Sequence, residues 1–218
     1  MIWDWAFAAS IVPSLLDGLW VTVQVTLVGT AIALLLGLGV AVVRYSRIPL
    51  LGKLFDFFVL FVRGTPLLVQ AYFAFYVLPN VGVQFSPLVT GIIVIGINYS
   101  AYTAEVYRAG IQSVPAEQWE ASTALSLSAV QRWRFVVLPQ AVRDVVPALG
   151  NYVVQMFKDS AILSAITVFE LLSHATSIGS GSYRYLEPLT IAGLLFLAVS
   201  LPAAKMIKRL ELRLAHPR

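Results

Sequence analysis

The chain has 218 residues, of which 59% are hydrophobic and only 12% are charged, and its formal net charge is +4. A soluble domain of ordinary composition is about a quarter charged, so this composition argues against a soluble protein and predicts a chain that crosses a membrane several times. The absence of cysteine excludes a disulfide framework, a thiolate metal site and a cysteine nucleophile.

The first predicted elements are an interfacial segment and a membrane span. The segment 1–17 is short, rich in aromatic residues and includes Pro13. We expect it to lie at the membrane interface, because tryptophan favours the headgroup level of a bilayer. Asp4 and the lack of a basic region before it argue against a cleavable signal. The uncharged run 18–43 exceeds the ~20 residues that a span requires, so we expect it to cross the membrane.

Four more apolar runs follow, and they predict further spans at about 54–78, 88–107, 147–172 and 188–206. Turn-forming residues separate the second and third spans, and a polar, glycine-rich loop is expected at 172–187. No internal repeat is visible. The predicted fold class is therefore an all-α polytopic membrane protein with about five transmembrane helices, organised as one domain over 1–218.

The basic residues indicate the orientation of these spans. They gather in alternate connections and in the tail, at Arg44, Arg47, Lys53, Arg108, Arg132, Arg134, Arg143, Lys205, Lys208, Arg209, Arg213 and Arg218. The opposite connections contain only Arg184. By the positive-inside rule, the N-terminus lies outside and the C-terminus is cytoplasmic. The positive charge is then a topology signal, and no nucleic-acid partner is expected.

A polar island at 113–141 interrupts the apolar sequence before the fourth span. A proline followed by two glutamates suits the start of a short helix. Ser128 and Gln131 have capping-box spacing, so a second helix is expected to start there and to stop before Pro139. Two short helices joined by a bend would form a rigid helical loop on the cytoplasmic side. From the residues alone, an amphipathic surface connector is the alternative.

The island resembles the EAA loop of bacterial ABC-importer permeases, whose pattern is Glu-Ala-Ala, three residues, Gly, nine residues and Ile-x-Leu-Pro. Here Glu120-Ala121-Ser122 is followed by Ser126 at the glycine position and by Val136-Val137-Leu138-Pro139. The spacing is complete over the whole pattern. Ser126 replaces the residue that most easily adopts a left-handed bend, at a cost of roughly 1 kcal/mol if the bend is retained.

This resemblance implies a type I ABC-importer permease fold in which the island couples to an ATP-binding subunit. The residues implied in that contact are Trp119, Glu120, Ala121, Ser122, Ser126, Leu138 and Pro139. The chain contains no Gly-x-x-x-x-Gly-Lys-Ser/Thr sequence, so ATP and magnesium are expected on a separate dimer of ATP-binding subunits. No enzyme activity, metal or cofactor is expected in this chain itself.

The resemblance also implies the remaining partners and the location. These are a second permease chain, identical or a sibling, an extracytoplasmic solute-binding protein, and the lipid bilayer of a bacterial cytoplasmic (inner) membrane.

Ionisable residues at membrane depth point to a substrate pathway. Lys158 and Asp159 fall roughly midway along the fourth predicted span and diverge by about 100° on a regular helix, so they cannot simply pair with each other. Each needs a partner elsewhere, either a zwitterionic ligand or a buried charge across a subunit interface. The polar residues expected to complete a cavity are Asn98, Tyr99, Ser100, Tyr102, Gln155 and Ser160.

Three further charged residues are expected to have structural or gating roles. Glu105 and Arg108 lie near the cytoplasmic end of the third span. Arg63 is interpreted either as a residue that snorkels to the cytoplasmic end of the second span or as a structural or gating residue. It belongs to Arg63-Gly64-Thr65-Pro66, which resembles a signature of the polar amino-acid branch of the permease family.

The substrate class implied is a polar amino acid or an amino-acid-like zwitterion. Within that branch, the segments 99–103, 118–121, 156–168 and 184–190 are similar to permeases of ectoine and hydroxyectoine importers. An ectoine site and a glutamine or histidine site would have nearly the same chemistry. The alternatives are an ion-driven secondary carrier, which usually has more spans and inverted repeats, and a non-transporting membrane anchor for a cytoplasmic partner.

Overall fold

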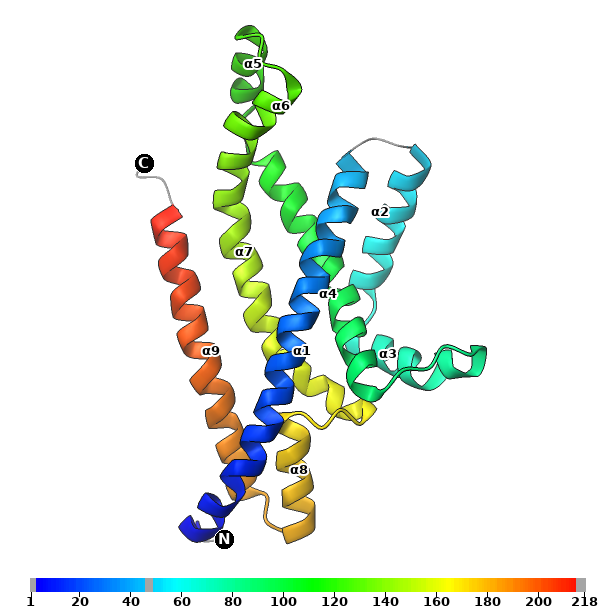
Figure 1. Ribbon diagram of the computed structural model, residues 1–218, viewed down its shortest axis with the longest axis vertical. Helices are drawn as coiled ribbons and strands as arrows, with labels where there is room; N and C mark the ends of the chain where they lie inside the picture. Colours follow the sequence, from blue (N-terminus) through cyan, green and yellow to red (C-terminus); the bar gives the residue numbers. More distant parts are fainter. Residues whose placement is uncertain (1–2, 46–48, 215–218) are drawn as a thin grey trace.

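The structure is a computed structural model that describes residues 3–45 and 49–214. Within these ranges every regular element is helical (Figure 1). In chain order the elements are α1 (Trp5–Tyr45), α2 (Pro49–Gly64), α3 (Leu67–Tyr72), η1 (Phe73–Val77), η2 (Leu78–Val81), α4 (Pro87–Gln112), α5 (Ala116–Ala124), α6 (Ala129–Arg132), η3 (Trp133–Val137), α7 (Leu138–Asp159), η4 (Ser160–Ile166), α8 (Leu171–Ser182) and α9 (Leu186–Leu214).

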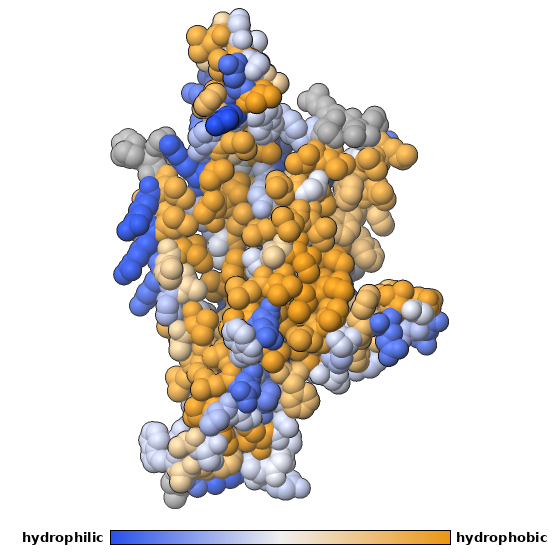
Figure 2. Space-filling view, in the orientation of Figure 1, coloured by the Kyte–Doolittle hydropathy of each residue, from blue (hydrophilic) through white to orange (hydrophobic). Residues whose placement is uncertain are grey.

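Three helices, α1, α4 and α9, are long and apolar enough to cross a membrane, and two bent pairs of helices would raise the number to five. The apolar surface covers much of the middle of the molecule, and more polar side chains gather at the end that carries the N-terminus (Figure 2). An all-α polytopic fold is therefore confirmed. Arg47 and Arg218, two of the basic residues that indicate orientation, lie outside the described residues.

The first helix is longer than predicted. Helix α1 runs without interruption from Trp5 through Pro13, so its first turns do not form a separate interfacial segment. Ile11 and Leu15 on these turns are buried with residues of α8 and α9. This packing outweighs the backbone hydrogen bond that Pro13 cannot make.

Helices α1 and α4 form the centre of the bundle and approach each other closely at Gly37. A Cβ atom at Gly37 would lie 2.8 Å from the Ser100 carbonyl oxygen. The Thr103 hydroxyl donates a hydrogen bond across this contact to the Ala33 carbonyl, at 2.7 Å. Small residues and interhelical hydrogen bonds of this kind hold helices together where lipid removes the hydrophobic driving force.

The second apolar run, which was predicted as a span at 54–78, contains a sharp bend. Helix α2 ends at Gly64, and the chain bends by 105° before α3 continues at Leu67. Pro66 lacks a backbone N–H and disfavours helical geometry at the residue before it. We call this bend the elbow (residues 64–67).

The fourth span and the loops beside it also differ from the prediction. The helix that starts at Ser128 does not stop before Pro139, because the wide π turn η3 carries it into α7. Gln140 donates its side-chain amide to the Val136 carbonyl at 2.8 Å, in the turn that contains the proline. Helix α7 ends at Asp159, and the expected loop at 172–187 contains α8, whose first N–H groups are capped by the Glu170 carboxylate.

Candidate functional site

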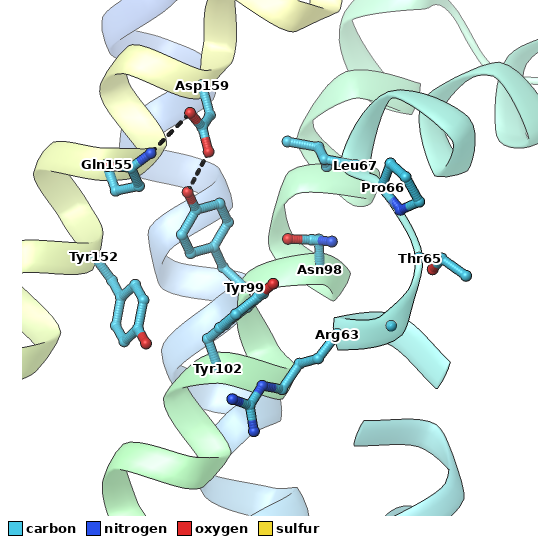
Figure 3. A pocket seen from close by; sticks show the side chains of 11 residues that line it. Arg63, Thr65, Pro66, Leu67, Asn98, Tyr99, Tyr102, Tyr152, Gln155 and Asp159 are labelled. Atoms are coloured by element: carbon cyan, nitrogen blue, oxygen red, sulfur yellow. Dashed lines mark hydrogen bonds between the residues drawn. The ribbon is translucent and has the colours of Figure 1, made fainter. Parts of the chain in front are cut away.

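Helices α4 and α7 and the elbow line an open cavity of about 490 Å³, which we call the polar cavity (Figure 3). Its walls are Arg63, Gly64, Thr65, Pro66 and Leu67 from the elbow region, Asn98, Tyr99 and Tyr102 from α4, and Tyr152, Gln155 and Asp159 from α7. Asn98, Tyr99, Tyr102, Gln155 and Asp159 were predicted to share a cavity, and the structure brings them together. Whether substrate binds them stays a prediction.

Asp159 forms the acidic wall of the polar cavity. The Tyr99 hydroxyl donates to Asp159 Oδ2 at 2.6 Å, and Gln155 donates to Oδ1 at 3.0 Å. No basic side chain of the described residues pairs with this carboxylate. The hydrogen-bond donors to Asp159 are therefore neutral side chains.

Three tyrosines line the cavity beside Asp159. The ring centroids of Tyr99, Tyr102 and Tyr152 lie 5.7–5.9 Å apart in each pairing. Their faces carry negative quadrupole charge, which suits the ammonium or guanidinium group of a ligand. Tyr152 was missed by the sequence analysis, because a single aromatic residue in an apolar helix gives no signal until the tertiary contacts are known.

Arg63 lies at the opposite side of the cavity. It is the penultimate residue of α2, and its guanidinium carbon lies 5.3 Å from the Tyr102 ring centroid. The end of α2 that follows the basic connection is more than a dozen residues, or roughly 20 Å, away. Arg63 therefore does not snorkel to that end, which corrects one of its two interpretations.

Gln70 supports the elbow and was also missed. Its side-chain N–H group donates to the Val62 carbonyl at 2.9 Å and lies 2.7 Å from the Thr65 hydroxyl. The Gln70 amide oxygen accepts from Asn98 at 3.1 Å. One amide thus satisfies a carbonyl left open by the break and fixes a cavity residue.

Three of the predicted pathway residues do not reach the polar cavity. Ser100 and Ser160 are buried and donate to carbonyls of their own helical turns, those of Ile97 and Phe157. Lys158 is exposed and does not line the cavity, although Asp159 beside it does. The two charged side chains therefore diverge as expected, and only Asp159 lines the polar cavity.

Glu105 and Arg108 belong to an ion cluster near the end of α4 that leads into the polar island (residues 113–141), which we now call the coupling loop. Arg44 pairs with Asp56 at 2.6 Å and also with Glu105, and Glu105 pairs with Arg108. Beside this cluster is a second cavity of about 510 Å³, which we call the ionic cavity. Its lining is Arg44, Asp56, Val59, Leu60, Arg63, Gly64, Tyr102 and Glu105.

The predicted coupling residues form a compact loop between α4 and α7. Glu120, Ala121, Ser126, Leu138 and Pro139 are exposed. Ser122 is buried and Trp119 is half-buried, so these two side chains pack mainly inside the loop and contribute little accessible surface. Trp119 makes an edge contact with Trp133, with ring centroids 5.8 Å apart.

The apolar surface of this loop comes mainly from residues that were not in the predicted set. Leu125, Val130 and Phe135 each expose two thirds or more of their surface. Together with the exposed Glu120, they make the accessible surface of the loop both apolar and acidic.

Comparison with known proteins gives consistent results. The model of the family described as binding-protein-dependent transport system inner membrane component matches residues 5–216. A probable amino-acid ABC transporter permease of Sinorhizobium fredii is 41% identical over 209 residues, which cover 96% of this chain and 90% of that protein. The arginine transport system permease ArtQ of Bacillus subtilis is 32% identical, covering 95% of this chain and 96% of that protein.

A solved structure agrees over nearly the whole chain. The crystal structure of an amino acid ABC transporter with histidines contains a chain that superposes with a TM-score of 0.93 and 34% sequence identity. The match covers 98% of this chain and all of that one.

Proposed function

The chain belongs to the inner-membrane components of binding-protein-dependent transport systems, and from this premise we propose that it conducts a polar, zwitterionic amino acid or a similar compound through the polar cavity. It is an amino-acid ABC transporter permease subunit that spans the inner membrane and has no enzymatic activity. ATP hydrolysis belongs to a separate subunit, and the family implies a substrate-binding protein.

The observation that carries the proposed substrate class is the separation of charge in the polar cavity. Asp159 stands at one wall with only neutral donors, and Arg63 stands at the other without a carboxylate partner among the described residues. A zwitterion supplies an ammonium group for the first and a carboxylate for the second. The tyrosines between them would stabilise a cationic group at a depth where an unpaired charge is costly.

The identity of the substrate within this class is set by few contacts. A basic amino acid is favoured by the acid–tyrosine wall, and arginine is the substrate that the name of one relative prints. Ectoine, glutamine and histidine carry the same separated charges and belong in the same comparison. We propose the class, and the experiment below names the compound.

The two ends of the helix bundle differ, and we propose that each contacts a different protein partner. The coupling loop would dock on an ATP-binding subunit through Glu120 and the apolar residues beside it. Two permease chains would pair with two such subunits. The substrate-binding protein would meet the opposite end, where the N-terminus lies (Figure 1). In this proposed arrangement, the N-terminus lies outside and the C-terminus lies in the cytoplasm.

The test is ATPase activity and uptake in proteoliposomes that contain this chain, its ATP-binding subunit and its binding protein. Arginine, ectoine, glutamine, histidine and glutamate are added in turn. A single ligand should stimulate both activities. For that ligand, Asp159→Asn should lower the uptake rate roughly 10- to 100-fold, because a hydrogen bond to a charged group is lost.

Lys158→Met is the matched control, because it removes a charge from the neighbouring residue outside the cavity. It should leave uptake unchanged. Equal effects of both substitutions, or no effect of Asp159→Asn, would contradict the proposed site. Uptake that an ionophore abolishes, without any ligand-stimulated ATPase activity, would instead indicate an ion-driven carrier.

A further inference from the structure

The polar cavity and the ionic cavity meet at one contact. Both are lined by Arg63, Gly64 and Tyr102, and the remaining walls of the two cavities are different. Beyond this contact the polar cavity leads toward Asp159, and the ionic cavity leads toward Glu105 and Arg44 near the coupling-loop end of the bundle. The direct route from the polar cavity to the ionic cavity passes Arg63 and Tyr102.

Arg63 differs from the other arginines beside these cavities in how it is held. Arg44 and Arg108 are both fixed by carboxylates of the ion cluster. Among the described residues, Arg63 has no ion pair and lies over the face of Tyr102. Figure 3 shows its side chain reaching past the Tyr102 ring, away from Asp159. A cation over an aromatic ring is held less firmly than an arginine between two carboxylates, so this side chain is free to exchange partners.

The backbone leaves room for such an exchange. Arg63 is followed by Gly64, the end of α2, and no atom lies within 4 Å of where a Cβ on Gly64 would be. The Arg63 side chain is exposed to the cavities and not packed in the core. It can therefore swing about the end of α2 without displacing a neighbouring helix.

We propose that the contact between Arg63 and Tyr102 is the inner gate of the pathway, which closes the polar cavity toward the ionic cavity while no substrate is moving. This rests on the proposed function for its physiological meaning, because the gate would separate the bound solute from the cytoplasm. Arg63 and Tyr102 act here by closing the passage between the two cavities. The cation and the ring face are both needed, so a bulky apolar residue at either position would not replace them.

The test measures access to the polar cavity from the coupling-loop side. Because the chain has no cysteine, single-cysteine variants need no altered background. Leu67→Cys reports on the polar cavity, and Leu60→Cys reports on the ionic cavity. Each is prepared in inside-out vesicles with the ATP-binding subunit, without nucleotide or substrate, and treated with a cationic or an anionic membrane-impermeant methanethiosulfonate.

The proposed gate predicts which second substitutions accelerate modification of each cysteine variant. Adding Arg63→Ala should raise the modification rate at Leu67→Cys by about two- to fivefold with both reagents, since an exposed cation–ring contact is lost. Tyr102→Leu should do the same, whereas Tyr102→Phe, which keeps the ring face, should leave the rate low. The rate at Leu60→Cys should be unchanged throughout, which also checks that each variant is folded.

Three results would overturn the gate. The first is an unchanged rate at Leu67→Cys in both Arg63→Ala and Tyr102→Leu. The second is acceleration with the cationic reagent alone, which would show a change of local charge and not of access. The third is equal acceleration in Tyr102→Phe and Tyr102→Leu. None of these measurements contains substrate, so an error in the proposed substrate class would not alter them.

Discussion

Ser126 holds a backbone φ of 53° at the end of α5. The Ser126 N–H donates to the Thr123 carbonyl and the Leu127 N–H donates to the Ser122 carbonyl, at 2.9 and 3.1 Å. These are the two hydrogen bonds of a Schellman motif. The left-handed bend that glycine usually provides in this loop is therefore retained with a serine, and the loop carries the strain.

This strain predicts that Ser126→Gly stabilises the loop. The change should lower the free energy of the bend by about 1 kcal/mol, since glycine adopts positive φ without a Cβ clash. Hydrogen exchange at the Ser126 and Leu127 amides should then slow by about fivefold.

The matched control is Ala124→Gly, in the last turn of the same helix, where φ is helical. There glycine should be destabilising by about 0.5–1 kcal/mol, and the same amides should exchange faster. Faster exchange in Ser126→Gly would show that the serine makes a favourable contact that outweighs the backbone strain.

Individual residues could be predicted from the sequence where the determining interaction is local. The capping box of Ser128 and Gln131 forms as expected, because both partners lie within one helical turn. The divergence of Lys158 and Asp159 follows from helix geometry alone. Ser160, a predicted pathway residue, does not line the polar cavity, because the face on which its side chain lies depends on how α7 ends and how η4 continues it.

Among the elements, three prolines have three different outcomes. Pro13 lies within a continuous helix, Pro139 follows a π turn, and Pro66 breaks the chain into the elbow. The sequence signal is the same in each case, a missing N–H. Tertiary packing and the local turn around each proline decide the outcome, and neither can be read from apolar runs. A nearby side chain can compensate for the carbonyl that is left without a donor, whether or not the helix continues.

At the elbow, Gln70 provides that compensation, which leads to a prediction. Gln70→Leu should destabilise the purified chain by roughly 1–3 kcal/mol, because the Val62 carbonyl loses a donor and Asn98 loses an acceptor. The midpoint of thermal unfolding in detergent should fall accordingly.

Gln118→Leu is the appropriate comparison. Gln118 is exposed, and its side chain makes one long contact, 3.5 Å, with Gln140. It should leave the midpoint unchanged. If Gln70→Leu unfolds at the same temperature as the unsubstituted chain, the elbow is held by packing and not by this amide.

For the whole molecule, the two ends are built from different interactions. Asp4 and Glu187 both pair with Arg184, at 3.2 and 2.8 Å, which ties the start of α1 to the turn before α9. The Phe7 backbone N–H and the Arg184 guanidinium hold the pKa of the Asp4 carboxyl below its usual range. This end contains a compensated charge cluster, whereas the coupling-loop end carries the excess of basic residues that the positive-inside rule places in the cytoplasm.

The orientation that follows can be measured with two exposed positions, one at each end. Tyr183, between α8 and α9, exposes 86% of its surface, and Leu125 in the coupling loop exposes 73%. In intact spheroplasts, an impermeant maleimide should label Tyr183→Cys at once, and it should label Leu125→Cys only after the membrane is permeabilised. Trp5→Cys and Val130→Cys repeat the measurement at each end and should follow their neighbours. Labelling of the two coupling-loop positions in intact spheroplasts would place that loop outside, where no ATP-binding subunit could reach it.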